Sequence, residues 1–125
     1  MNIQEALDLV DQMKPNTMDR GLKIHYLQEI DQLIHDEIIM KHEHTEEQEA
    51  MPRYDIDTDP GTELLVKDPY SEMYTYWLMS KIDLQNREPD MYNNDRTLFE
   101  NAYDTMSDWW TREHMPLQTY KHFKV

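Results

Sequence analysis

Apolar residues recur at helical spacing along most of this chain, and the breaks in the pattern divide it into four candidate helices. The first covers residues 2–14. Asn2 and Glu5 have the spacing of a capping box, in which each side chain binds a free amide of the first turn. Pro15, which lacks an amide hydrogen, ends this helix. Its buried face is predicted to comprise Ile3, Ala6, Leu7, Val10 and Met13.

A second, longer helix is predicted after the break at residues 15–17, with Asn16 or Thr17 as its N-cap. Most of its acidic residues fall on the opposite side from its apolar ones, as in an amphipathic helix, and it is expected to fray near His42. The predicted buried stripe is Leu22, Tyr26, Leu27, Ile30, Leu33, Ile34 and Ile38.

Two proline residues mark the starts of two further helices. Asp68 is the expected cap of a helix over residues 69–86, with Pro69 at the first helical position, where a missing N–H has no cost. A helix over residues 89–114 also begins on proline and is ended by Pro116. Because the connection between them is short, these two helices are predicted to form an antiparallel hairpin.

Composition supports a mainly α fold in one domain. The chain has 125 residues, of which 38% are hydrophobic, enough for one core and too few for two. Only two glycines and six prolines are present, fewer turn residues than a β-sandwich requires. We therefore predict a single domain over residues 1–125: a small bundle of about four helices with a hairpin of two long ones, a short β-hairpin arm and an extended C-terminal tail.

The connection over residues 43–68 is strongly acidic. Nine acidic residues stand there against two basic ones, which gives −7 of the chain's net charge of −14, and like charges at this density extend a chain. Residues 53–57 and 63–66 have the pattern of two short strands around the turn at residues 59–61. The sequence predicts a projecting acidic arm with the contact candidates Tyr54, Asp55, Asp57, Asp59 and Glu63.

The last nine residues, 117–125, reverse this charge. They contain two lysines and a histidine but no acid, and aromatic residues alternate loosely among them. Such a segment is suited to add as an extended strand or hook to an acidic or open-edged neighbour. The predicted contact residues of this tail are Leu117, Tyr120, Lys121, His122, Phe123 and Lys124.

Aromatic residues are unusually frequent in the two long helices. Rings at helical spacing are first of all candidates for the core, but two pairs cannot both be buried in one direction. Tyr74 and Tyr76 lie about 200° apart around a helix, and Trp109 and Trp110 about 100° apart. Exposed Tyr and Trp often anchor protein contacts, so all four are candidate subunit-interface residues.

No pattern in the sequence indicates catalysis, a metal or a cofactor. Asp55, Asp57 and Asp59 resemble the start of a calcium loop, but Pro60 stands at the position that needs glycine and Val66 at the one that needs a carboxylate. The histidines lack the spacing of zinc-protease or di-iron motifs, and no serine or threonine lies in a glycine-flanked elbow. The chain is expected not to be an enzyme and to have no cofactor.

Charge and hydropathy limit the other expected partners. A net charge of −14 repels nucleic acid, because DNA binding requires cations. Residues 1–10 carry acids instead of a basic segment and an apolar run, and no stretch reaches the roughly 20 apolar residues of a membrane span. A soluble, cytoplasmic protein without membrane contact is the expectation.

Several strings of residues resemble small proteins encoded among the head genes of tailed bacteriophages and prophages. The resemblance extends over nearly the whole chain. The strings are ALDLV (6–10), KPN (14–16), TELLV (62–66), PYSEMYTYWL (69–78), YNN (92–94), FENAY (99–103) and HMP (114–116).

Within that group the chain is similar to head–tail adaptor proteins, also called connector or head-completion proteins. The resemblance implies a structural virion protein that joins the portal at the capsid vertex to the tail, located in the virion neck after assembly in the host cytoplasm. It implies a ring of copies, expected to be dodecameric, around a channel through which DNA passes without specific binding. The implied partners are the portal protein, clasped by the C-terminal segment, and a tail-side neck or tail-terminator protein.

Another class of function is open to so acidic a chain. An acidic DNA mimic that inhibits a nucleic-acid-binding host enzyme is also small, helical and negative. Such a protein needs carboxylates spread along one face, whereas half of the net charge here falls in the connection over residues 43–68. The adaptor is therefore the preferred hypothesis and the mimic the alternative.

Overall fold

Four α-helices make up the body of the computed structural model, which describes residues 1–117. They are α1 (Ile3–Met13), α2 (Arg20–Glu37), α3 (Glu72–Gln85) and α4 (Pro89–Glu113). Two short 3-10 helices, η1 (Ile39–Lys41) and η2 (Glu47–Glu49), lie in the connection between α2 and α3. The predicted mainly helical fold with four helices is confirmed.

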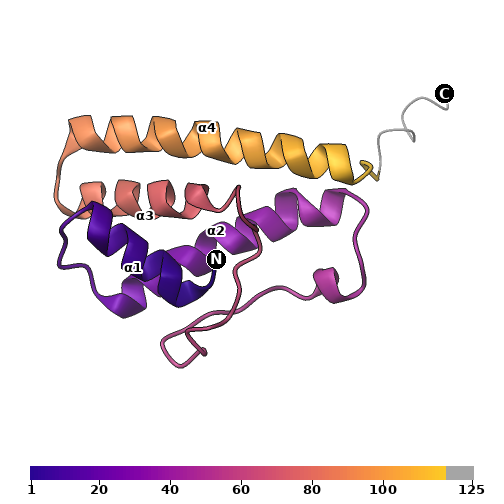
Figure 1. Ribbon diagram of the computed structural model, residues 1–125, viewed down its shortest axis with the longest axis horizontal. Helices are drawn as coiled ribbons and strands as arrows, with labels where there is room; N and C mark the ends of the chain where they lie inside the picture. The colour runs from indigo at the N-terminus through magenta and orange to yellow at the C-terminus, as the bar shows by residue number, and fades with distance from the viewer. Residues whose placement is uncertain (118–125) are drawn as a thin grey trace.

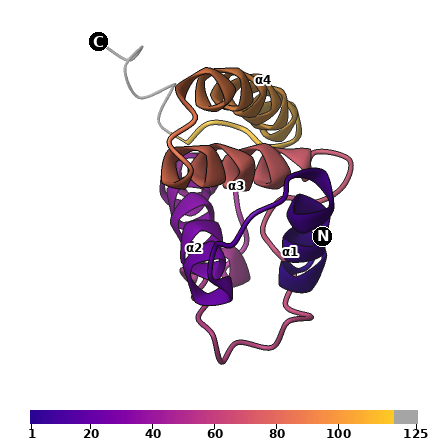
Figure 2. The same cartoon turned by 90° about the vertical axis from the view of Figure 1, so that its left-hand side faces the viewer.

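The central element is α3. Figure 1 shows α4 running antiparallel along one side of it, and Figure 2 shows α1 and α2 side by side on the other. Because α3 contacts all three other helices, its buried side chains surround the helix instead of forming one stripe. They are Met73, Tyr74, Thr75, Trp77, Leu78, Ser80, Ile82 and Asp83.

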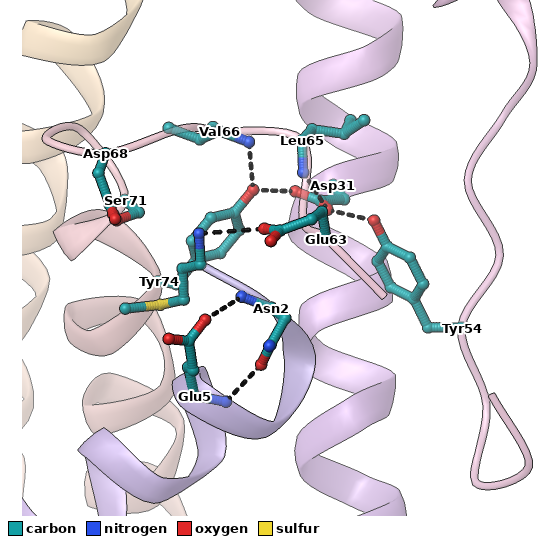
Figure 3. A network of polar contacts seen from close by, with 11 residues as sticks. Asn2, Glu5, Asp31, Tyr54, Glu63, Leu65, Val66, Asp68, Ser71 and Tyr74 are labelled. Carbon is teal, nitrogen blue, oxygen red and sulfur yellow. Dashed lines mark hydrogen bonds and ion pairs between the residues drawn. The ribbon is translucent and has the colours of Figure 1, made fainter. Parts of the chain in front are cut away.

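Helix α1 begins with the predicted capping box. The Asn2 side chain accepts from the Glu5 amide at 2.8 Å, and the Glu5 carboxylate accepts from the Asn2 amide at 2.9 Å (Figure 3). The predicted apolar face is buried except for Met13, which is 51% exposed. The box satisfies two of the amides that every helix start leaves free.

Helix α2 begins at a different cap from the one predicted. Asp19 is the N-cap and accepts from the Gly21 amide at 2.9 Å, so neither Asn16 nor Thr17 has this role. The reason is local: the side-chain oxygen of Asn16 accepts from the Met18 amide at 3.0 Å, which holds residues 16–18 in a turn outside the helix.

The buried face of α2 also differs from the predicted stripe. Leu22 and Leu33 are 37% and 40% exposed, Tyr26 is half-buried, and the other predicted positions are buried. Their places in the interior are taken by Lys23, Ile24, Asp31 and His35. Polar side chains are stable there because α2 is covered by α1, α3 and the connection, which supply their partners.

The ends of the α3–α4 hairpin agree with the prediction except at the start of α3. That helix begins at Glu72 because the preceding residues form a turn, in which the Tyr70 amide donates to the Lys67 carbonyl at 2.9 Å. Between the helices, Arg87 has a φ of 56°, the left-handed conformation that closes many helix C-termini. Pro89 opens α4 as predicted, and Glu113 ends it.

The predicted β-hairpin over residues 53–66 is not formed. Within residues 1–117 the only β pairings are two isolated bridges, Asn2 with Glu63 and His42 with Pro116. The main-chain groups of residues 60–64 bond instead to the N-terminal segment: the Ile3 amide donates to the Thr62 carbonyl, and the Leu64 amide to the Met1 carbonyl, both at 3.0 Å. The alternating apolar positions reflect burial against helices, not strand pairing.

The acidic connection therefore does not project as a whole. It runs beneath α1 and α2 in the lower part of Figure 1. Tyr54, Leu64 and Val66 are part of the hydrophobic core, while residues 55–57 and 59–61 are exposed. Repulsion among its carboxylates is outweighed because these apolar side chains and the main-chain bonds tie it to the body.

Candidate functional site

A row of aromatic rings lies at the C-terminal end of α4. The rings of Tyr70 and Trp109 are stacked with centroids 4.9 Å apart, and Trp109 meets Trp110 edge-on at 5.8 Å. Trp110 in turn stacks on His114 with centroids 3.9 Å apart. We call these four residues the aromatic ladder. Trp109 and His114 are half-buried, so the ladder is partly open to solvent.

A groove of about 390 Å³ lies beside the aromatic ladder. It separates α4 from the part of the connection that contains η1, η2 and residues 65–67. Its apolar wall consists of Ile39, Ala50, Leu65, Trp109 and Trp110, and its polar rim of Glu47, Gln48, Lys67 and His114. The indole N–H of Trp110 is buried and has no acceptor among the described residues. The groove thus combines ring surfaces with an unused hydrogen-bond donor.

The four predicted interface aromatics are not equivalent. Tyr74 is completely buried and Trp110 is 8% exposed, so the prediction that they are exposed contact residues is wrong. Tyr74 lies in the core because α3 is covered on several sides, and Trp110 because it belongs to the one buried stripe of α4, together with Phe99 and Met106. Tyr76 and Trp109 are half-buried and can make contacts.

The predicted arm residues divide in the same way. Tyr54 is 9% exposed and points into the protein, so it is not an arm contact. Asp55, Asp57 and Asp59 are exposed, but Asp55 and Asp59 accept from nearby amides at 2.8 Å and act as turn residues. Glu63 is exposed and lies 3.2 Å from the N-terminal amino group (Figure 3).

Only the first of the predicted tail residues is described. The Leu117 amide donates to the Lys41 carbonyl at 3.0 Å, and the Glu43 amide donates to the Met115 carbonyl at 2.8 Å. Residues 115–117 are thus paired with residues 41–43. The remaining tail candidates, Tyr120, Lys121, His122, Phe123 and Lys124, lie outside the described residues.

A buried carboxylate at the centre of the fold joins three segments that are distant in sequence. Asp31 of α2 accepts from the hydroxyl of Tyr54 at 2.6 Å and from that of Tyr74 at 2.5 Å, and also from the Leu65 amide at 3.1 Å (Figure 3). The Tyr74 hydroxyl itself accepts from the Val66 amide at 2.9 Å. We call this network the Asp31 anchor. It fastens the middle and the C-terminal end of the connection to α2 and α3.

The pKa shifts in the Asp31 anchor follow from its burial. Burial raises the pKa of the Asp31 carboxyl above its ordinary value, although the hydrogen bonds from both tyrosines and Leu65 oppose this. Burial and the adjacent Asp31 carboxylate raise the pKa of Tyr54 and of Tyr74. The tyrosines thus remain protonated donors, and every polar side-chain atom of the anchor has a partner. This arrangement suits a structural anchor better than a catalytic group.

A second buried charged centre lies where α1 meets the α3–α4 hairpin. The Lys14 ammonium donates to the Asp83 carboxylate and lies 3.5 Å from an oxygen of Asp95. All three side chains are at most 8% exposed. We call them the Lys14 triad. One oxygen of each carboxylate has no hydrogen-bond partner among the described residues.

The Lys14 triad carries one negative charge more than its lysine neutralises. Burial and the neighbouring Asp83 raise the pKa of Asp95 to about 6, although Lys14 opposes this. Burial disfavours the charged form of Lys14, but its bond and ion pair with Asp83 raise its pKa above the ordinary value. The triad links α1 to both helices of the hairpin and, like other buried ion pairs, is sensitive to the loss of one member.

Neither centre was predicted from the sequence. Asp31 did carry a signal, because Leu27 and Ile34 stand four positions before and three after it, on the same helix face. A polar residue flanked in this way is a candidate for burial. Lys14, Asp83 and Asp95 are far apart in sequence, and only the packing of three helices brings them together.

The hydroxyl of Tyr103 is predicted to lower the stability of the fold. It is buried without a partner in the described part of the chain, beside a hollow of about 220 Å³ between α2 and α4. Burial, together with the charges of Glu37 and Asp104, raises the pKa of Tyr103 to about 12. An unpaired buried hydroxyl costs stability because it has lost its bonds to water.

Tyr103→Phe is therefore expected to raise the free energy of unfolding by about 1 kcal/mol. Urea unfolding followed by circular dichroism at pH 7 measures this. Tyr74→Phe is the matched comparison and is expected to lower stability, because the Tyr74 hydroxyl bonds to Asp31 and Val66. A loss of stability in Tyr103→Phe equal to that in Tyr74→Phe would contradict the assignment.

The histidines at the end of α2 and after η1 make structural bonds. A ring nitrogen of His35 lies 3.0 Å from the carbonyls of Gln48 and Glu49, and His42 bonds to the Ile38 carbonyl at 2.7 Å. Within residues 1–117 no three His, Asp or Glu side chains are arranged to hold a metal ion. In the same part of the chain, no helix has the length and apolar character needed to cross a bilayer.

Comparisons of the chain with protein-family models, with curated proteins and with solved structures find no match.

Proposed function

We propose that this chain is a structural assembly protein of the head–tail adaptor class, which joins the portal to the tail in the virion neck. The resemblance of its residue strings supplies the class. Many of these residues, among them Leu64, Val66 and Tyr74, build the α3–α4 hairpin and the Asp31 anchor. In this hypothesis the residue strings that resemble adaptor proteins determine the buried framework of the fold. The residues on the surface of that framework make the contacts with partners.

The observation that carries the proposal is the position of the aromatic ladder. Its partly open rings and the adjacent groove lie next to Leu117, from which the basic tail continues. Aromatic side chains with a polar edge are the residues that most often anchor protein contacts. A candidate contact surface thus lies near Leu117, after which the sequence is basic and aromatic.

The acidic surface is consistent with a DNA channel. Asp55, Asp57 and Asp59 are exposed at the tip of the connection, and many other carboxylates are exposed on the helices. A negative wall repels the DNA polyanion, so a genome would pass without binding. In the proposed ring, expected to be dodecameric, the exposed acids of the connection are the candidates for this wall.

The charge also predicts how the ring forms. Packing many copies of a −14 subunit has an electrostatic cost that falls with added salt or a basic partner. Purified alone at low salt, the chain is expected to be monomeric in light scattering, and to form a ring only when portal protein is present. The portal-bound ring should be visible by electron microscopy. A stable ring of the isolated chain at low salt would contradict this prediction.

One observation favours the alternative of an acidic DNA mimic. Glu100, Asp104 and Asp108 are exposed at intervals of four residues along α4, about 6 Å apart along the helix axis. This stripe is the spread of carboxylates that a mimic requires. The portal experiment separates the two functions: a chain that ignores portal protein but blocks cleavage of duplex DNA by host-cell extract is a mimic.

A further inference from the structure

The groove beside the aromatic ladder is lined by a tryptophan with a hydrogen-bond donor that is unpaired within residues 1–117. Trp110 is 8% exposed, yet its indole N–H has no acceptor among the described residues. Leaving such a donor unpaired is unfavourable, and a peptide carbonyl that reached it would satisfy it. Trp109 presents a half-buried ring surface next to it. The groove therefore favours an extended peptide that brings both carbonyl oxygens and apolar or aromatic side chains.

The described chain ends at the rim of this groove. Residues 115–117 run antiparallel to residues 41–43, with bonds from the Glu43 amide to Met115 and from the Leu117 amide to Lys41. Ile39 and His114, which line the groove, lie close in sequence to these two pairs. Eight residues follow Leu117, and fully extended they span about 26 Å. A segment of this length is thus tethered close in sequence to residues that line the groove.

Charge and side-chain type are complementary as well. Residues 118–125 contain two lysines, a histidine, a tyrosine and a phenylalanine but no acid. The segment next to the groove exposes Glu43, Glu46, Glu47 and Glu49, against Lys41 and the rim residue Lys67. A basic, aromatic peptide is complementary to this acidic, ring-lined surface.

We propose that residues 118–125 dock into the groove of their own chain, with Tyr120 and Phe123 against the aromatic ladder and Lys121 and Lys124 toward the acidic segment. The docking is intramolecular because a tethered segment has an effective concentration in the mM range, well above that of a second copy in dilute solution. This docking concerns the isolated chain and does not depend on the proposed adaptor function. In an adaptor, however, the tail would have to leave the groove before it could clasp a portal.

The first test compares the full chain with a variant that ends at Leu117. Truncation is expected to increase quenching of tryptophan fluorescence by acrylamide and to shift the Trp110 indole N–H resonance in ¹H–¹⁵N NMR spectra. A synthetic peptide of residues 118–125 added to the truncated chain should reverse both changes. Half-saturation is expected at or below about 1 mM, because docking of the tethered segment requires a Kd below its effective concentration.

Matched variants separate docking from a general change in stability. In the full chain, Tyr120→Ala with Phe123→Ala should reproduce the effect of truncation, and raised salt should weaken peptide binding. In the truncated chain, Trp109→Ala should abolish peptide binding, whereas Leu84→Ala, which alters an apolar residue that is 52% exposed at the other end of the hairpin, should not.

Two results would overturn the inference. One is a truncated chain with the same quenching and the same indole resonance as the full chain, together with no binding of the peptide. The other is protection of the indole that is lost on dilution of the full chain, because the occupant would then be the tail of a second copy. The truncation and peptide experiments leave Trp109 and Trp110 unaltered, so a folding defect in Trp109→Ala does not affect them.

Discussion

Replacing Asp31 by alanine is expected to lower the free energy of unfolding by about 3–5 kcal/mol. The change leaves three buried donors without an acceptor: the hydroxyls of Tyr54 and Tyr74 and the amide of Leu65. It also detaches the connection from α2 at two points. Against a total stability of about 5–15 kcal/mol for a domain of this kind, the loss is a large fraction.

Urea unfolding measured by circular dichroism gives this value directly. The control is Asp36→Asn on the same helix, where an exposed carboxylate bonds only to His35 and little change is expected. Hydrogen exchange adds a local measurement, because the amides of Leu65 and Val66 should lose protection first. An Asp31→Ala protein as stable as Asp36→Asn would show that the anchor does not hold the connection.

Asp95→Asn is expected to raise stability at neutral pH by about 1–2 kcal/mol, less than the whole pKa shift would give because the variant also loses the attraction between Lys14 and Asp95. The pKa of Asp95 is about 6 in the folded chain, compared with an ordinary value of 3.8 for an aspartate carboxyl. A folded-state pKa above the unfolded one means that the folded protein binds the proton more tightly. The stability due to this group is thus complete below pH 4 and is lost as the pH rises through 6.

Asparagine at position 95 imitates the protonated acid. Its amide is able to donate to the unpaired oxygen of Asp83, while Lys14 keeps its bond to Asp83. The triad of the variant then has a single carboxylate, that of Asp83, beside the lysine. The pH-dependent loss attributed to Asp95 should be absent from the variant.

The measurement is the free energy of unfolding of both proteins between pH 4 and pH 8. The raised pKa of Asp31 contributes a slope of the same sign, but it is present in both proteins and cancels in their difference. Asp108→Asn, an exposed position on the same helix, is the control for removal of a surface charge. If Asp95→Asn were the less stable protein at pH 8, the triad would need both of its negative charges.

The local features of this fold could be predicted from the sequence. The capping box at Asn2 and the start of α4 at Pro89 depend on residues within one helical turn of each other, and both were predicted as observed. The number of helices and the antiparallel hairpin followed from apolar spacing and a short connection. Such features are determined by nearest neighbours along the chain, which a sequence shows directly.

The predictions that failed depend on which elements lie on either side of a residue. Tyr54 and Tyr74 were predicted to be contact residues at the surface. Both are buried, because Asp31, which is far away in sequence, supplies an acceptor for their hydroxyls. The alternation in residues 53–66 indicated strands, but their main-chain groups find partners in the N-terminal segment and α2.

The sequence by itself determined a helical, acidic chain with an aromatic hairpin and a basic tail, because helical periodicity and charge are local properties of the residues. Only the tertiary structure decided that α3 is central, that Asp31 and the Lys14 triad are buried, and that a groove opens beside Trp109. Burial of a charge is stable only where distant segments supply its partners, and a groove exists only between elements that have already packed.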